Sequence, residues 1–318
     1  MKSDIIAITD HIKDFSIEKE ILGKYLEDKL SKRTTIILVW HKQIDKVFLD
    51  KYPAIRAVVR YGVGYDNIDI DYCKKKNIIV ANTPDYGIDE VADSALAMIL
   101  YLTRKIGSLE DLAKADSNYW LGKKFNLNMR RLNKLSLGII GLGRIGSSIS
   151  KKFSVFSRNI SFYDPYKSNG YEKVYGINRH RNLLDLLKES DIITINTPLT
   201  KETKGLVNKE FLNQMKKGSY LINLSRGPIL ENKDLILEKL LSKHLEGYGT
   251  DVWTNEPPLK DDQLYDAWKQ NHEDLKGRII VNPHTAYYSK EALLESRNKA
   301  CSTCLDIINK RYINNRIV

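Results

Sequence analysis

The chain has 318 residues, 42% of them hydrophobic, and carries 51 lysines and arginines against 40 aspartates and glutamates, a net charge of +11. This length is typical of two domains. The chain starts without the apolar stretch of a signal peptide, and no uncharged apolar run is long enough to cross a bilayer, so we expect a cytoplasmic protein with no membrane span. The lysines are scattered and accompany no nucleic-acid motif, so the excess positive charge favours a solvated surface over nucleic-acid binding.

The first part of the chain alternates strand-like and helix-like patterns. Helical spacing is found at residues 17–30 and 91–106, and apolar or β-branched runs predict strands at 5–9, 35–40, 55–60 and 78–81. Strands that alternate with helices predict a parallel sheet covered by helices. The polar segment 116–133 that follows is typical of a linker.

A clearer alternation follows this linker. Strands are expected at residues 136–140, 160–163, 192–196, 220–224, 249–253 and 279–281, with helices between them at 145–157, 183–189, 209–215 and 233–241. Six strands with helical crossovers predict a doubly wound sheet, and a last helix at 289–309 is expected to pack on the first domain. We therefore expect an α/β protein with two doubly wound parallel-sheet domains. One is a smaller, flavodoxin-like domain (1–110 plus 287–318), and the other is a Rossmann domain (111–286).

A glycine-rich turn lies between the first strand and the first helix of the second domain. The three glycines have the G-x-G-x-x-G spacing of dinucleotide-binding proteins, in the strand-to-helix context that this interpretation requires. The first permits a tight turn, the second lets the backbone approach a pyrophosphate, and the third lets the helix pack closely on the strand. The helix N-terminus offers N–H groups and partial positive charge to phosphates. The predicted phosphate-binding residues are Gly141, Gly143, Arg144, Ile145 and Gly146.

Asp164 ends the next strand, about 20 residues beyond the glycines. A carboxylate at this place accepts hydrogen bonds from the ribose hydroxyls of the cofactor and repels a 2′-phosphate, so NAD is favoured over NADP. Lys167 is close in sequence and leaves NADP open.

Chemically active side chains follow the other strands of this domain. In an open α/β sheet, ligands bind at the carboxyl ends of the strands. Hydride transfer to a 2-oxo acid needs a cation for the carboxylate, a proton donor for the carbonyl oxygen and a carboxylate to orient that donor, and we assign these roles to Arg226, His284 and Glu256. The other residues expected to line the cofactor at these ends are Thr197, Pro198, Ser225 and Asp251.

Each of these three residues has an ordinary alternative. Arg226 alone could be a surface arginine in a turn, Glu256 a solvated carboxylate and His284 a loop histidine, but their joint placement at strand ends makes coincidence a weak explanation. Cys301 and Cys304 form a C-x-x-C, yet they lie in a helical pattern without the four ligands of a structural zinc site, so we expect no metal.

These residues also carry a family resemblance. The chain resembles the D-isomer-specific 2-hydroxyacid dehydrogenases over nearly its whole length, with the motifs in order. The matching segments are 62–69, 82–84, 91–93, 137–146, 198–200, 223–227, 251–253, 256–257 and 283–284. The resemblance implies an NAD-dependent oxidoreductase that interconverts a 2-oxo acid and a D-2-hydroxy acid.

The resemblance also implies roles that the residue patterns do not. Val63 and Gly64 would donate backbone N–H groups to the substrate carboxylate in the smaller, substrate-binding domain. Asp251 would contact the nicotinamide carboxamide, and the segment 91–133 would form a hinge and the interface of a homodimer.

Two segments depart from the family pattern. A long polar insert covers residues 259–277, and the aromatic segment 285–289 after His284 is more similar to the C-terminal-binding-protein branch. Tyr287 would therefore line the substrate pocket. This similarity leaves open an alternative function, that of an NAD(H)-sensing, corepressor-like protein that binds partners and has little turnover.

Overall fold

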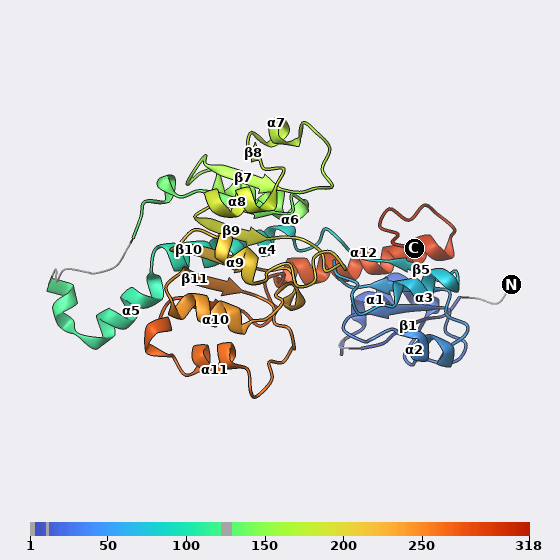
Figure 1. Cartoon of the computed structure of the whole chain (residues 1–318). Helices are drawn as coiled ribbons and strands as arrows, with labels where there is room; N and C mark the ends of the chain where they lie inside the picture. The colour runs from blue at the N-terminus through green and yellow to red at the C-terminus, as the bar shows by residue number, and fades with distance from the viewer. Residues whose placement is uncertain (1–3, 11–12, 122–128) are drawn as a thin grey trace. The chain divides into compact units, whose positions relative to one another are not determined.

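The computed structural model describes residues 4–10, 13–121 and 129–318 (Figure 1). It divides the chain into two compact units, one made of Met1–Gly87 with Tyr288–Val318 and one made of Ile88–Tyr287. The first boundary falls at residue 87 rather than at the expected 110, because helix α4 (Ile88–Thr103) packs on α6, β10 and β11 of the larger unit. Among the described residues, no helix combines the length and the apolarity needed to cross a membrane.

The smaller unit contains a five-stranded parallel sheet in the order β2-β1-β3-β4-β5. The strands are β1 (Ile6–Ile8), β2 (Leu26–Glu27), β3 (Ile36–Val39), β4 (Ala57–Arg60) and β5 (Ile79–Ala81), and the helices are α1 (Ser16–Leu22), α2 (Lys46–Lys51), α3 (Ile70–Lys75) and α12 (Lys290–Ile308). Every residue of β3 is buried, as expected for a parallel strand covered on both faces. The helix expected at 17–30 ends at Leu22, because Gly23 adopts a φ of +50° and begins a 3₁₀ turn (η1, Gly23–Tyr25) that leads into β2.

Helix α12 belongs to the smaller unit, where it packs on α1 and β4. Arg297 of this helix forms an ion pair with Glu18 of α1, whose side chain is fully buried. Cys301 and Cys304 are buried free thiols in the same helix, and burial raises the pKa of Cys301 to about 12. Within the part of the chain that the structure describes, no group of three or more His, Cys, Asp and Glu side chains is placed to hold a metal ion.

The larger unit contains a seven-stranded parallel sheet in the order β12-β11-β10-β9-β6-β7-β8. Its strands are β6 (Leu137–Ile140), β7 (Ile160–Tyr163), β8 (Asn178–Arg179), β9 (Ile192–Ile195), β10 (Ser219–Asn223), β11 (Leu245–Thr250) and β12 (Ile279–Val281). The chain runs outward from β6 to β8 and then returns to β9 on the other side of β6, which makes β6 and β9 the switch point of a doubly wound sheet. The predicted fold class is therefore confirmed. The edge strand β8 was not predicted, and β11 ends at Thr250, so residues 251–253 follow it.

Helices cover both faces of this sheet (Figure 1). Their side chains pack against it in two separate cores. The helices are α4, α5 (Ile106–Ala115), α6 (Arg144–Phe153), α7 (Tyr171–Tyr175), α8 (Leu183–Glu189), α9 (Lys209–Gln214), α10 (Asp234–Leu241) and α11 (Gln263–Lys269). The polar insert 259–277 contains α11 and the 3₁₀ turn η5 (Glu273–Leu275), and it buries Leu264 and Leu275 in one core. Of the expected linker, residues 116–121 and 129–133 include the 3₁₀ turn η2 (Ser117–Leu121) and the start of η3 (Leu132–Lys134), while 122–128 lie outside the described residues.

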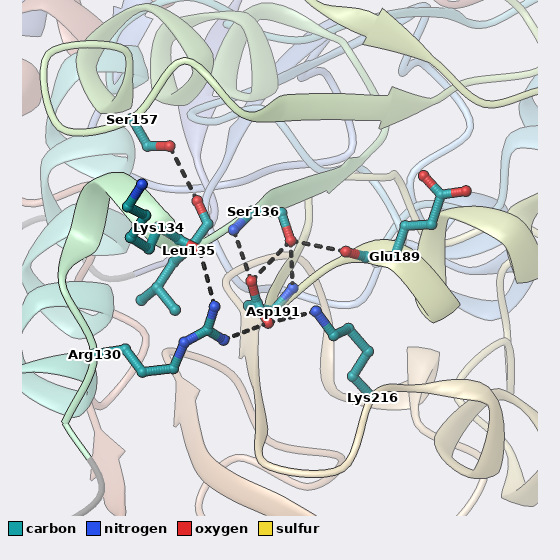
Figure 2. A network of polar contacts seen from close by, with 8 residues as sticks. All are labelled: Arg130, Lys134, Leu135, Ser136, Ser157, Glu189, Asp191 and Lys216. Carbon is teal, nitrogen blue, oxygen red and sulfur yellow. Dashed lines mark hydrogen bonds and ion pairs between the residues drawn. The ribbon is translucent and has the colours of Figure 1, made fainter.

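A polar network fastens β6 to β9 at the amino edge of the sheet (Figure 2). Oδ2 of the buried Asp191 accepts hydrogen bonds from the N–H of Ser136 at 2.9 Å and from its hydroxyl at 3.0 Å. Oδ1 accepts from Nη1 of Arg130 at 2.8 Å and from Nζ of Lys216 at 2.6 Å. The two strands at the switch point are thus tied together at the end opposite to the glycine turn.

Candidate active site

The glycine turn has the geometry that a pyrophosphate requires. Gly141 has a φ of +88°, and a Cβ there would lie 2.8 Å from the carbonyl oxygen of Asn196. A Cβ on Gly146 would lie 2.2 Å from the carbonyl oxygen of Gly141, so only glycine lets α6 pack this closely on the turn. At Gly143 a Cβ would meet no atom within 4 Å, which leaves open space beside the backbone where α6 begins. The ten-residue helix α6 directs its first N–H groups toward this space.

Two buried polar atoms at the end of β9 support a ligand at this turn. Oδ1 of Asn196 and Oγ1 of Thr197 are buried and lack a hydrogen-bond partner among the described residues. Buried acceptors without partners are rare in folded proteins and often mark a ligand or water site. The residues present therefore fit a bound dinucleotide. Thr197 was predicted here, whereas the side chain of Asn196 was missed, although its place at a strand end was the available signal.

Asp164 lies at the glycine turn, as its position after β7 predicted. Its Oδ2 accepts a hydrogen bond from the N–H of Leu142 at 2.9 Å, and its Oδ1 accepts one from the N–H of Tyr166 at 3.0 Å. Arg179 of β8 holds the following loop by donating to the carbonyl oxygens of Asp164 at 3.1 Å, Lys167 at 2.7 Å and Ser168 at 2.9 Å. The ammonium group of Lys167 lies 5.1 Å from the ring centroid of Tyr171, in a cation–π contact.

The structure brings His284 and Glu256 together. Nδ1 of the imidazole lies 2.6 Å from Oε2 of Glu256, and Oε1 of the same carboxylate accepts the N–H of Trp253 at 2.8 Å. His284 has a φ of +54°, a backbone conformation uncommon for residues other than glycine, and its N–H donates to the carbonyl oxygen of Asp251 at 2.8 Å. The side chain of His284 is 32% exposed, so the imidazole is both held and accessible.

The charge of Glu256 is stabilised by its neighbours. Burial tends to raise its pKa, but the hydrogen bonds with His284 and the Trp253 N–H, together with the positive charge of Arg226, hold the pKa of this carboxyl below its usual value. Glu256 is therefore ionised at neutral pH. An ionised carboxylate on Nδ1 keeps the proton on that nitrogen and directs Nε2 toward a substrate.

Arg226 reaches this site because of the glycine that follows it. A Cβ on Gly227 would lie 2.0 Å from the carbonyl carbon of Trp253, so the two segments touch backbone to backbone. The side-chain amide of Asn223 donates to the carbonyl oxygen of Arg226 at 3.1 Å, and Nη1 of Arg226 donates to the carbonyl oxygen of Ser225 at 2.8 Å. The hydroxyl of Ser225, predicted to line the cofactor, donates to the carbonyl oxygen of Ile195 at 2.8 Å and joins β9 to β10.

Asp251 supports the loop that carries the histidine. Its Oδ1 accepts hydrogen bonds from the N–H of Thr285 at 2.8 Å and of Ala286 at 2.9 Å, while Oδ2 takes no part in these two bonds. Burial raises the pKa of this carboxyl to about 6, against the lowering effect of these N–H groups and of His284. The expected contact with a nicotinamide carboxamide stays a prediction, and the support for the histidine loop is a function that sequence reasoning missed.

The remaining predicted residues lie at several places. Pro198 follows Thr197 beyond β9, and its carbonyl oxygen accepts the hydroxyl of Thr203 at 2.6 Å. Tyr287 is the last residue of the larger unit, whereas Val63 and Gly64 follow β4 in the smaller unit. Their predicted contacts with substrate stay predictions.

The chain is similar to known oxidoreductases in sequence and in structure. Residues 96–286 match the family model described as D-isomer specific 2-hydroxyacid dehydrogenase, NAD binding domain. The chain is 36% identical over 268 residues to D-3-phosphoglycerate dehydrogenase of Bacillus subtilis, a match that covers 84% of this chain and 48% of that protein. It is 35% identical over 288 residues to glyoxylate reductase of Pyrococcus horikoshii, covering 87% and 81%. The crystal structure of D-lactate dehydrogenase from Aquifex aeolicus, complexed with NAD and lactic acid, superposes with a TM-score of 0.86 at 28% identity over 99% of both chains.

Proposed function

The chain belongs to the D-isomer-specific 2-hydroxyacid dehydrogenase family, and from this premise we propose that it interconverts a 2-oxo acid and a D-2-hydroxy acid by hydride transfer with NAD. The chain spans about half the length of the phosphoglycerate dehydrogenase relative, so that enzyme's substrate is not carried over. The observation that carries the proposal is the 2.6 Å contact between His284 and Glu256, with Arg226 brought close by the packing of Gly227 on Trp253. The pair can move a proton, and the guanidinium can hold a carboxylate.

We propose that the larger unit holds the cofactor. The turn formed by Gly141, Gly143 and Gly146, with the N–H groups of Arg144 and Ile145, would hold the pyrophosphate, and Asp164 would accept the ribose hydroxyls. Thr197, Pro198, Ser225 and Asp251 complete the proposed cofactor set. When bound, NADH supplies the hydride for carbon C2 of the substrate.

The protein's own residues would perform the remaining steps. Arg226 binds the substrate carboxylate in a bidentate manner and orients the neighbouring carbonyl group. His284 donates a proton from Nε2 to the carbonyl oxygen as that oxygen gains charge, and takes it back in the oxidation direction. Glu256 keeps the imidazole oriented and stabilises its protonated form. In the smaller unit, Val63 and Gly64 would donate backbone N–H groups to a substrate carboxylate. In the larger unit, Tyr287 would face the substrate side chain.

A steady-state assay tests this proposal. The fall in NADH absorbance is followed over a panel of 2-oxo acids that includes glyoxylate, hydroxypyruvate and pyruvate, with the His284→Ala variant as the matched negative control. Turnover by the wild type and its loss in the variant are expected. Binding of NADH without turnover of any 2-oxo acid would instead support the corepressor-like alternative. The relatives named for this chain are dehydrogenases and a reductase, so they do not favour that alternative.

A homodimer is the proposed assembly. Trp120 and Leu121 of η2, which follows α5, are 77% and 83% exposed, and exposed apolar side chains of this size favour an interface. Sedimentation of the Trp120→Ser, Leu121→Ser double variant is expected to show a monomer where the wild type sediments as a dimer.

The cytoplasmic location also stays a proposal, which the three free cysteines support because a reducing compartment keeps thiols free. Cell fractionation tests it.

A further inference from the structure

Two carbonyl groups in the turn after β4, those of Gly62 and Val63, accept hydrogen bonds from the turn after β5. β4 and β5 are neighbours in the sheet, so the residues that follow them lie side by side. The carbonyl oxygen of Gly62 accepts the N–H of Thr83 at 3.0 Å, and the carbonyl oxygen of Val63 accepts Nδ2 of Asn82 at 2.7 Å. Asn82 is 6% exposed, so the amide that donates the second bond is buried.

These two hydrogen bonds also fix the direction of the N–H groups of Val63 and Gly64, because each peptide bond is planar. In a trans peptide the C=O of one residue and the N–H of the next point in opposite directions. Because the carbonyl groups of Gly62 and Val63 point toward residues 82 and 83, the N–H groups of Val63 and Gly64 point away from them. Within residues 4–10, 13–121 and 129–318, neither of these two N–H groups donates a hydrogen bond.

Asn82 is itself firmly held. Its N–H donates to the carbonyl oxygen of Asn315 at 3.3 Å, and the N–H of Ile317 donates to the carbonyl oxygen of Val80 at 2.7 Å. The end of the chain thus pairs with the outer edge of β5, just before Asn82. A rigid support is what an amide needs if it is to set the direction of a neighbouring peptide.

A positive charge lies beside the same turn. A Cβ on Gly62 would lie 2.4 Å from Nη1 of Arg60, so the guanidinium is adjacent to the Gly62 backbone. Two N–H groups that point outward beside a guanidinium form a site that favours an anion.

We propose that Asn82 is a positioning residue, which holds the Val63–Gly64 peptide so that the N–H groups of Val63 and Gly64 bind the substrate carboxylate. This inference rests on the proposed function, because it deepens the role given there to the Val63–Gly64 turn. Asn82 does not touch the substrate. Without its amide, the carbonyl group of Val63 loses its buried partner, and the peptide is free to rotate and to turn the N–H of Gly64 away from the ligand.

The experiment compares two Asn82 variants with a control in the same unit. Asn82→Asp keeps the shape of the side chain but replaces the donor Nδ2 with an oxygen that repels the Val63 carbonyl group. Asn82→Ala removes the side-chain amide altogether. The control, Thr35→Val, removes side-chain hydrogen bonds just before β3, where Oγ1 of Thr35 accepts the N–H of Ile5 at 3.0 Å and donates to Oδ1 of Asp4 at 2.9 Å. For each protein we measure the KM and kcat for glyoxylate, the Kd of oxamate in the presence of NADH, the Kd of NADH, and the ¹⁵N–¹H shifts of Val63 and Gly64 as oxamate is added.

We expect the Kd of oxamate and the KM for glyoxylate to rise about 10- to 100-fold in both Asn82 variants, the loss of one hydrogen bond to a charged group. kcat should change far less, and the Kd of NADH and all values for Thr35→Val should stay within about two-fold of wild type. In the wild type, oxamate should shift the amide signals of Val63 and Gly64, and in Asn82→Asp it should not.

Three results would overturn the inference: oxamate that fails to bind the wild type, amide signals of Val63 and Gly64 that do not move in the wild type, or oxamate affinity that Asn82→Asp retains. The failure of the proposed function has a different signature. In that case oxamate binds and shifts the two amide signals in an Asn82-dependent manner, but the wild type reduces no 2-oxo acid of the panel. The positioning role of Asn82 toward a carboxylate would then stand without the reaction.

Discussion

Nδ1 of His284 lies 2.6 Å from Oε2 of Glu256, although 28 positions separate the two residues in the chain. The carboxylate holds the imidazole by one nitrogen and leaves the other for the substrate. This division of the two nitrogens is what a histidine needs to act as a proton donor of defined direction.

Replacing Glu256 with glutamine removes the negative charge and keeps the shape. We expect kcat/KM for 2-oxo acid reduction to fall about 10- to 100-fold, because the imidazole loses the charged partner that orients it. Steady-state kinetics with glyoxylate check this. The control is Glu189→Gln, which affects a second His–Glu pair of this unit, where Nε2 of His180 lies 3.5 Å from Oε2 of Glu189. An unchanged kcat/KM in Glu256→Gln would exclude the proposed role of Glu256.

Arg226 is expected to act through geometry as well as charge. Arg226→Ala should raise the KM and lower kcat/KM. The fall in kcat/KM should correspond to a loss of roughly 2–4 kcal/mol of transition-state stabilisation. Arg226→Lys should recover little of the loss, because an ammonium cannot bind a carboxylate in the bidentate manner of a guanidinium. Steady-state kinetics with glyoxylate measure both variants, and the Kd of NADH should stay close to the wild-type value. Near-normal turnover by Arg226→Ala would remove this residue from the mechanism.

Asp251 should lower the stability of the protein at neutral pH. Its pKa rises from 3.8 to about 6 in the folded state, so the folded protein binds this proton more tightly than the unfolded chain does. The stabilisation by the bound proton is fully present below about pH 4 and is lost as the pH rises through 6. A pKa difference of this size corresponds to at most about 3 kcal/mol. Asp251→Asn keeps an oxygen for the N–H groups of Thr285 and Ala286, so we expect this variant to unfold at higher denaturant concentration than the wild type at pH 7.

The two proteins should converge as the pH falls toward 4, which urea titrations at several pH values measure. We also expect Asp251→Asn to lose activity at pH 7, because the proposed contact with the cofactor changes. A variant that is less stable than wild type at pH 7 would contradict the expected effect of the buried charge.

Asp164 provides a test of cofactor choice that separates charge from structure. Asp164→Asn keeps an acceptor for the N–H of Leu142 but removes the charge, so the preference for NADH over NADPH should fall about ten-fold, mainly through tighter NADPH binding. Asp164→Ala also removes the acceptor and should weaken the binding of both cofactors. Fluorescence titrations with NADH and NADPH give the four dissociation constants. An unchanged preference in Asp164→Asn would show that other groups select the cofactor.

Asp191 should contribute to stability without affecting the reaction. Burial opposes its charge, but hydrogen bonds from Lys216, Ser136 and Arg130 hold its pKa below the usual value. Its stabilising contribution is therefore present above about pH 4 and is lost as the pH falls through the lowered pKa. We expect Asp191→Ala to cost about 1–3 kcal/mol at pH 7, because the N–H of Ser136 loses its acceptor, and less at pH 3, with the KM for NADH unchanged. A variant that is as stable as wild type at pH 7 would show that the network in Figure 2 is not what holds β6 against β9.

Much of the fold could be predicted because its signals are local. Alternating apolar runs and helical periods depend on residues only a few positions apart, and they predicted most strands of both sheets. The predictions failed where a local detail overrode the period. Gly23 ended a helix that the pattern continued to residue 30, and β8 has only two residues, too few for a pattern. The domain boundary at Gly87 depends on what α4 packs against, which its own sequence does not record.

The nucleotide turn and the residue types that follow each strand could be predicted from the sequence, because the glycine spacing and the strand ends are local features of the chain. Which of those residues meet depends on the folded chain. The backbone contact of Gly227 with Trp253, the two N–H groups that Asp251 holds and the amide of Asn82 on the Val63 carbonyl group all join residues distant in the chain. Such contacts depend on strand order and close packing, to which every element of the unit contributes and which no short segment encodes.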